Sequence, residues 1–277
     1  MKTLREDIFI EGIGVHSGHS VHLRLRPSEE GQILFRRTDL GGAEMLLNPH
    51  KAVTSSSTVL EGENFRVGTV EHLLASLWAA GIGSCVIDLD ADEIPIMDGS
   101  ALPFAQAIEK AGTADLKISQ SSWRIVQAFT VEEKDAWIRF EPAEAGDKKR
   151  LTLSYTISYD HPMIGLQSRS LALSWPEFTR EIAPARTFGF LKDVEWFRRQ
   201  GLARGASYEN TIVLDEAGIV NPPLRFPDEF VRHKLLDLAG DLALLGRPLI
   251  GLVSAYKAGH RLHLQAVRAL LSKRYIV

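Results

Sequence analysis

Side chains that bind metals or transfer protons recur at four-residue intervals between Glu229 and Asp241. They are His233, Asp237 and Asp241, and an α-helix would bring them within about 80° of one another on one face. His-x-x-x-Asp spacing puts an imidazole and a carboxylate one turn apart, aimed at the same point. The stretch therefore predicts a metal-binding or acid–base face. A surface histidine beside two surface aspartates is the alternative interpretation.

The opposite side of the same stretch carries the apolar residues that a helix would pack on its core. These residues are Leu235, Leu238, Ala239 and Leu242. Gly246 provides a stop signal, so we predict a helix over about residues 228–245.

A second pair of reactive side chains, Glu71 and His72, begins another predicted helix. Residues 70–80 have helical apolar spacing, Thr69 is the expected N-cap and Gly81 the expected end. Because they are adjacent on a helix, the carboxylate and the imidazole point about 100° apart.

The order helix, glycine, strand, glycine-containing turn, helix occurs twice in the chain. The predicted elements are helices at 70–80 and 101–111 around a strand at 84–90, and helices at 228–245 and 262–273 around a strand at 248–256. This duplication predicts two halves of similar β/α build, each with helices packed against β-sheets. If the halves face each other, His72, His233 and Asp237 meet and leave an open coordination position, as in catalytic zinc sites.

The composition is that of an ordinary globular enzyme, with 277 residues, 45% hydrophobic, 24% charged and a net charge of −3. This charge gives no electrostatic reason to expect a nucleic acid partner. The single cysteine, Cys85, excludes an intramolecular disulfide and lies in an apolar run that predicts burial. No window approaches ~18 consecutive apolar residues and no signal-peptide pattern occurs, so we expect no membrane span and a cytoplasmic location.

A glycine-rich loop at residues 12–18 looks like a nucleotide-binding loop, but an alternating strand at 21–26 follows it instead of a helix. Without a helix N-terminus the dinucleotide interpretation fails. His16 is the chemically interesting side chain of this loop, which either connects two strands or contacts a ligand. Residues 113–122 show no periodicity and are predicted to link the two domains.

Several blocks of sequence, spread in order along nearly the whole chain, carry a further signal. They are Gly12–Gly18, Thr69–Leu73, Glu93–Ser100, Ala185–Phe190, Arg225–Lys234, Leu236–Asp241 and Lys257–His260. Together they resemble the UDP-3-O-acyl-N-acetylglucosamine deacetylases, the zinc amidases of lipid A biosynthesis. Any one block is weak, whereas the combination is highly specific.

The resemblance implies one zinc ion held by His72, His233 and Asp237, with water in the fourth position. It also implies that Glu71 is the general base. Zinc suits this chemistry because it lowers the pKa of bound water toward ~7 and offsets the charge of an oxyanion.

The resemblance further implies that His260 is a second, cationic catalytic group and that Asp241 holds it by a hydrogen bond. Thr187 would polarise the scissile carbonyl or stabilise the oxyanion. The leaving amine must gain a proton, and the sequence does not choose between Glu71 and His260 as its source.

Substrate-binding roles are implied as well: aromatic residues for the sugar, acyl chain or uracil, and cationic residues for the diphosphate or sugar. The residues are Tyr159, Phe188, Phe190, His16, Lys234 and Lys257. A hydroxyl-rich loop at residues 54–58 stands where some relatives have Met or Cys near the acyl entrance, so the preferred chain length stays open.

The family fold implies two α+β domains, 1–118 and 123–277, with the active site at their interface. An insert at about 190–220 would form an apolar passage for the acyl chain. The expected reaction is hydrolysis of the 2-acetamido group of a UDP-linked, 3-O-acylated glucosamine by a monomer that meets its lipid substrate near the inner membrane surface. A zinc amidase for another acetamido sugar and a metal-free binding protein are the alternatives.

Overall fold

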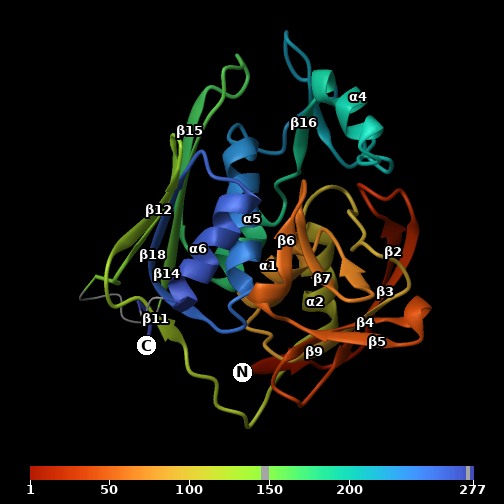
Figure 1. Ribbon diagram of the computed structural model, residues 1–277, viewed down its shortest axis with the longest axis vertical. Helices are drawn as coiled ribbons and strands as arrows, with labels where there is room; N and C mark the ends of the chain where they lie inside the picture. Colours follow the sequence, from red (N-terminus) through yellow and green to blue (C-terminus); the bar gives the residue numbers. More distant parts are fainter. Residues whose placement is uncertain (145–149, 273–274) are drawn as a thin grey trace.

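Two large β-sheets lie on either side of a layer of helices in the computed structural model, which describes residues 1–144, 150–272 and 275–277 (Figure 1). The helices of this layer are α1 (Glu71–Ala79), α2 (Leu102–Ala111), α5 (Glu229–Ala243) and α6 (His260–Ser272). The predicted α+β class is confirmed. Among the described residues, no helix is long and apolar enough to cross a membrane.

The sheet of the first half has the strand order β2-β3-β9-β4-β5. Its strands are β2 (Ile8–Ile13), β3 (Ser20–Pro27), β4 (Ile33–Arg37), β5 (Ala43–Leu46) and β9 (Cys85–Leu89). The central strand β9 is parallel to β4 and antiparallel to β3, while both outer pairs are antiparallel. Side chains alternate between buried and exposed along β3, as expected for a sheet with one face on the core.

The sheet of the second half repeats this arrangement, in the order β12-β13-β18-β14-β15. Its strands are β12 (Phe129–Glu133), β13 (Ala136–Glu141), β14 (Leu151–Ser158), β15 (Leu166–Ala172) and β18 (Leu249–Tyr256), with β11 (Trp123–Arg124) added beside β18. The central strand β18 is again parallel to β14 and antiparallel to β13. The predicted similarity of the two halves is therefore confirmed strand by strand.

The two halves also carry extra segments at the same point of the chain, between the outer strand β5 or β15 and the first long helix of that half. In the first half the segment forms a three-stranded sheet of β6 (Ala52–Thr54), β7 (Thr58–Gly62) and β8 (Phe65–Val67), preceded by the turn η2 (Pro49–Lys51). In the second half it comprises α3 (Trp175–Glu177), η3 (Phe178–Ile182), β16 (Phe188–Phe190), α4 (Leu191–Arg199) and β17 (Ile212–Leu214). Helix α4 stands away from the helix layer at the upper right of Figure 1.

Helix α5 is buried on every side except at Lys234. The sheet strands β14 and β15 cover one side of it, and α1 and α6 pack on others. The prediction of one apolar face opposite a polar face was therefore too simple. Since His233, Asp237 and Asp241 are 2%, 2% and 0% exposed, the interpretation as surface residues is wrong.

Two local predictions also need correction. The predicted linker begins with a strand, β10 (Thr113–Asp115), which pairs with β1 (Lys2–Leu4), so the unpaired connection is shorter than expected. The last helix starts at His260 rather than after it and is described to Ser272, because residue 273 lies outside the described residues. The remaining 3₁₀ turn is η1 (Thr38–Leu40).

Candidate functional site

Two histidines and an aspartate from different halves of the molecule converge between α1 and α5. The Nε2 atoms of His72 and His233 lie 3.8 Å and 3.3 Å from Oδ1 of Asp237, and the two imidazole rings meet edge to face at 5.1 Å. One potential ligand atom from each residue lies within 4.8 Å of the others. All three side chains are buried, so the site joins the halves at their interface.

A glycine determines how closely the two helices approach. A Cβ atom added to Gly240 of α5 would lie 2.1 Å from the carbonyl oxygen of Glu71. The backbone of the first turn of α1 therefore rests directly against α5, in a contact that a larger residue would prevent. This contact brings Glu71 and His72 beside Asp237 and Asp241.

His233 has the properties of a neutral nitrogen ligand. Burial lowers its pKa to about 3, although Asp237 acts in the opposite direction. Its Nδ1 lies 3.1 Å from the carbonyl oxygen of Ala185. Because a carbonyl oxygen only accepts hydrogen bonds, Nδ1 carries the proton and the lone pair of Nε2 faces Asp237.

The donor set fits a divalent transition metal. Two imidazole nitrogens and one carboxylate oxygen are the ligand types that zinc favours, and three protein ligands leave a position open. Within the described residues, Nδ1 of His72 is buried without a hydrogen-bond partner, so protein contacts alone do not satisfy this ring. His72, His233 and Asp237 are thus a group of residues that could hold a metal.

Glu71 lies beside this cluster with its carboxylate buried. Burial raises its pKa to about 7, partly offset by His260 and His72. Its Oε2 accepts a hydrogen bond of 3.1 Å from the backbone N–H of Thr58, while Oε1 lies 3.6 Å from Nε2 of His260. A carboxylate with this pKa can take up a proton near neutral pH.

His260, the first residue of α6, is held as a cation. Burial alone would lower its pKa, but Asp241, Glu71 and Asp237 together raise it to about 10. Its Nδ1 lies 2.7 Å from Oδ2 of Asp241. The pKa of Asp241 is lowered to about 2, because its imidazole neighbours outweigh the effect of burial.

Two partners of Asp241 were missed by sequence reasoning. His263 places Nδ1 2.7 Å from Oδ2 of Asp241, and Thr58 donates its hydroxyl proton to Oδ1. On its far side, Nε2 of His263 lies 3.1 Å from the Tyr155 hydroxyl. His263 could have been found from its position one turn after His260, whereas no sequence signal connects Thr58 with residues almost two hundred positions later.

The three aromatic residues predicted to bind substrate lie together next to the cluster. The ring of Tyr159 lies 5.8 Å from that of Phe188 and 5.9 Å from that of Phe190. Phe188 in turn lies 6.3 Å from the ring of His233. Thr187, just before these residues, is half-buried, and its backbone N–H donates to the carbonyl of Gly99 at 2.8 Å.

The predicted cationic contacts lie in different environments. Lys234 turns inward and donates to Oδ2 of Asp237 at 2.6 Å, a contact that raises its pKa against the effect of burial. Lys257 is exposed and pairs with Asp135 at 2.8 Å. The backbone N–H of His16 donates to the buried carboxylate of Glu93 at 3.0 Å. The His16 pKa is lowered chiefly by burial and further by His260, its electrostatic neighbour.

The same carboxylate of Glu93 explains why Thr69 is not an N-cap. The Thr69 hydroxyl donates to Glu93 at 2.7 Å, and Thr69 itself has a φ of +55°. Helix α1 consequently starts after Val70 without a side-chain cap. The prediction of a capping threonine was wrong, because a tertiary hydrogen bond competes for its hydroxyl.

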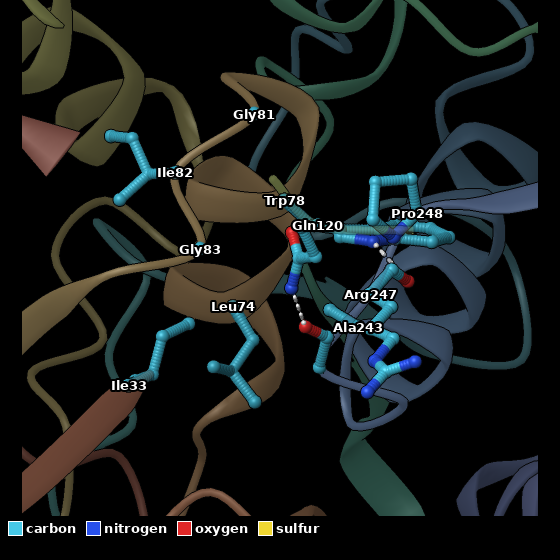
Figure 2. Close-up of a pocket in the computed structure, with 11 residues that line it drawn as sticks. Ile33, Leu74, Trp78, Gly81, Ile82, Gly83, Gln120, Ala243, Arg247 and Pro248 are labelled. Atoms are coloured by element: carbon cyan, nitrogen blue, oxygen red, sulfur yellow. Dashed lines mark hydrogen bonds between the residues drawn. The ribbon is translucent and has the colours of Figure 1, made fainter. Parts of the chain in front are cut away.

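A small cavity lies near the C-terminal ends of α1 and α5, away from the cluster (Figure 2). Leu74, Trp78 and Ile82 line one side, Ala243 and Arg247 the other, and the amide of Gln120 closes it by donating to Gly246 at 2.7 Å. Its volume of about 30 Å³ is enough for about two water molecules. Its lining is largely apolar and contains none of the residues singled out above.

Comparison with known proteins gives the family of the chain. A family model described as UDP-3-O-acyl N-acetylglycosamine deacetylase matches residues 1–272. The chain belongs to this family. The match to the deacetylase model includes α1, α5 and α6, so all the converging residues lie within it.

Curated relatives that carry the name UDP-3-O-acyl-N-acetylglucosamine deacetylase are similar over nearly all of this chain. The protein from Myxococcus xanthus is 46% identical over 275 residues, which cover 98% of this chain and 86% of that protein. The protein from Acidithiobacillus ferrooxidans is 42% identical, covering 99% and 90%. One from Neisseria meningitidis is 41% identical, covering 98% and 90%.

Proposed function

We propose that this protein hydrolyses the 2-acetamido group of UDP-3-O-(3-hydroxyacyl)-N-acetylglucosamine and releases acetate, an early committed step of lipid A biosynthesis. The observation that carries the proposal is the convergence of His72, His233 and Asp237 beside Glu71 and His260. Membership of the deacetylase family supports the same reaction.

One zinc ion, held by His72, His233 and Asp237, is the proposed cofactor. When bound, zinc supplies a Lewis acid for the scissile carbonyl and for the attacking water. The two imidazoles and the carboxylate come from both halves, so metal binding also joins the helices α1 and α5.

Glu71 is the proposed general base. Its Oε2 is engaged by the N–H of Thr58, which leaves Oε1 to receive the proton of the attacking water. Burial keeps this carboxylate basic enough to accept a proton near neutral pH, although the nearby His260 acts in the opposite direction.

His260 is the proposed cationic partner. Asp241 binds its Nδ1, so its Nε2–H points toward Glu71 and Asp237. There the proton can stabilise the developing oxyanion, with Thr187 as a further contact, or pass to the leaving amine. Glu71, once protonated, is the second possible donor to the amine.

The aromatic group of Tyr159, Phe188 and Phe190 is proposed to contact the uracil, sugar and acyl chain. His16, Lys234 and Lys257 are proposed to contact the diphosphate or sugar. Asp237 already engages Lys234, whereas Lys257 pairs with an aspartate that is 71% exposed. Lys257 can therefore exchange its partner for a diphosphate at lower cost.

Further features belong to the same proposal. They are domain limits at residues 1–118 and 123–277, an acyl passage in the insert at about 190–220, a monomeric state and a cytoplasmic location with transient contact to the inner membrane surface. Exposed Leu191 and Trp196 of α4 supply apolar surface in the insert.

The decisive experiment is deacetylation of the proposed substrate by metal-analysed protein, before and after chelation and after zinc is returned. We expect activity to disappear with the chelator and to return near one zinc per chain. A substrate without the 3-O-acyl chain is the specificity control. Equal turnover of both substrates would favour an amidase for another acetamido sugar, and absence of both zinc and turnover would overturn the proposal.

A further inference from the structure

A turn of the first half is bound to a segment of the second half that borders the site. The turn spans residues 98–101 and the segment residues 183–187. Their backbones are joined at both ends, because the N–H of Ala101 donates to Ala183 at 2.9 Å and that of Thr187 donates to Gly99 at 2.8 Å.

The guanidinium of Arg225 joins the same two stretches through side-chain contacts. Its Nη2 donates to Oδ2 of Asp98 at 2.7 Å, and its Nη1 donates to the Pro184 carbonyl at 2.9 Å and to Ser100 Oγ at 3.2 Å. A planar fork of donors can satisfy a carboxylate and a carbonyl at once, which an ammonium group does poorly.

A buried carboxylate fixes the other side of the segment. Glu229, the first residue of α5, is 0% exposed. Its Oε1 accepts from the backbone N–H of Arg186 at 3.0 Å and its Oε2 from that of Arg225 at 2.6 Å. Nε of the Arg186 guanidinium also donates to Oε1 of Glu229 at 2.9 Å. The segment is thus held to α5, the helix that carries His233.

The segment has one residue that touches a proposed metal ligand. The Ala185 carbonyl accepts the Nδ1 proton of His233, and this bond keeps Nε2 free. Any slip of the segment would move that carbonyl. The turn also packs closely against the insert, since a Cβ atom on Gly99 would lie only 2.0 Å from the Asn210 carbonyl oxygen.

We propose that Asp98, Arg225 and Glu229 form an interdomain clamp that positions the Ala185 carbonyl and so presents Nε2 of His233 to the metal. The inference rests on the proposed zinc site. It assigns positioning roles to Asp98, Arg225 and Glu229. These residues belong to the sequence blocks 93–100 and 225–234, and none of the three has a role in the proposed chemistry.

The partial exposure of the Asp98–Arg225 pair allows its effect on the site to be separated from its effect on folding. The side chains of Asp98 and Arg225 are 30% and 33% exposed, and partly exposed ion pairs contribute little to stability. Asp7 and Arg24 form a comparable ion pair in the first half, outside the clamp. The side chain of Asp7 is 29% exposed, and Nε of Arg24 donates to its Oδ2 at 2.8 Å. The Asp7→Asn variant is therefore the control.

The first measurement is zinc affinity of the metal-depleted full chain. We expect Asp98→Asn to weaken zinc binding about 10-fold, the lower end for loss of an outer partner of a metal ligand, and Asp7→Asn to leave it within about 2-fold. Arg225→Lys, which keeps the charge but loses the fork, should behave like Asp98→Asn. Equal affinities of Asp98→Asn, Arg225→Lys and Asp7→Asn would overturn the clamp.

The second measurement is the tautomer of His233 in the metal-free protein, from ¹⁵N-edited NMR with assignment by the His233→Gln variant. We expect the Nδ1–H tautomer in the wild type and in Asp7→Asn, and a mixture in Asp98→Asn. An unchanged tautomer in Asp98→Asn would also overturn the inference. If the wild type binds no zinc, the proposed function fails, while the tautomer measurement still decides the clamp.

Discussion

The two halves of the molecule share one strand order and one helix arrangement, yet they contribute different groups to the site. In the first half, α1 supplies His72 and Glu71 from adjacent positions of its first turn. In the second half, α5 supplies His233, Asp237 and Asp241 from successive turns, and α6 adds His260 at its start. The same framework thus positions the proposed base on one side and most of the proposed ligands and the proposed cation on the other.

The difference between the halves is also visible in their extra segments. The segment of the first half contributes Thr58, which binds both Glu71 and Asp241. The segment of the second half contributes Thr187, Phe188 and the Ala185 carbonyl. A duplicated fold therefore provides the geometry, while residues that differ between the copies provide the groups to which the proposed chemistry is assigned.

The largest expected effect tests whether the first half supplies the base. Glu71→Gln keeps the side-chain shape but cannot accept the proton of water, so kcat should fall about 10²- to 10⁴-fold. Zinc content should stay near that of the wild type, because Glu71 is not a proposed ligand. Steady-state kinetics with metal analysis checks both. Loss of zinc in this variant would place Glu71 among the ligands.

The next effect tests whether both halves hold the metal. His72→Gln and His233→Gln should each weaken zinc binding more than about 100-fold, beyond the range for outer partners of a ligand. Calorimetric or competition titration of zinc provides the measurement, with circular dichroism as a check on folding. Wild-type affinity in either variant would remove that histidine from the proposed ligand set.

At the contact between the halves, replacing Gly240 by alanine should lower the stability that this replacement usually raises in a helix. Alanine in place of a helix-interior glycine ordinarily stabilises by about 1 kcal/mol, but Gly240→Ala would place a Cβ 2.1 Å from the carbonyl oxygen of Glu71. We expect a net loss of about 1–3 kcal/mol of unfolding free energy and a lower kcat. Gly259→Ala, where a Cβ meets no described atom within 4 Å, is the control in denaturant titration.

The smallest effect concerns the groups that hold Asp241 within the second half. His263→Leu removes one of its donors, and kcat should fall about 10-fold, as for one hydrogen bond to a charged group. His263→Asn, whose amide can still donate, should recover most of that loss. Equal kcat in the leucine variant and the wild type would show that Thr58 and His260 hold Asp241 unaided.

Much of the site could be anticipated from local pattern. The predicted helix at 228–245 corresponds to α5, and the predicted halves share their topology. Helical spacing also placed Asp237 and Asp241 on the side of His233, because that relation depends only on the geometry of one helix. The roles of these residues in catalysis stay predictions.

What local pattern missed depends on contacts between distant segments. Thr69 was expected to cap α1, but its hydroxyl binds Glu93. The polar face of α5 was expected to be opposite its packing face, but the helix is enclosed on both. A buried carboxylate or imidazole is recognisable only when its partners are known, since burial and pairing are properties of the whole fold.

The sequence by itself determined which side chains are available and how they are spaced along each helix, because covalent geometry and helical periodicity act over a few residues. Only the tertiary structure decided that the first turn of α1 rests against Gly240 of α5, that Thr58 and His263 meet at Asp241, and that the turn at Asp98 holds the carbonyl behind His233. Those distances depend on how two sheets and their helices pack, which no single stretch of sequence specifies.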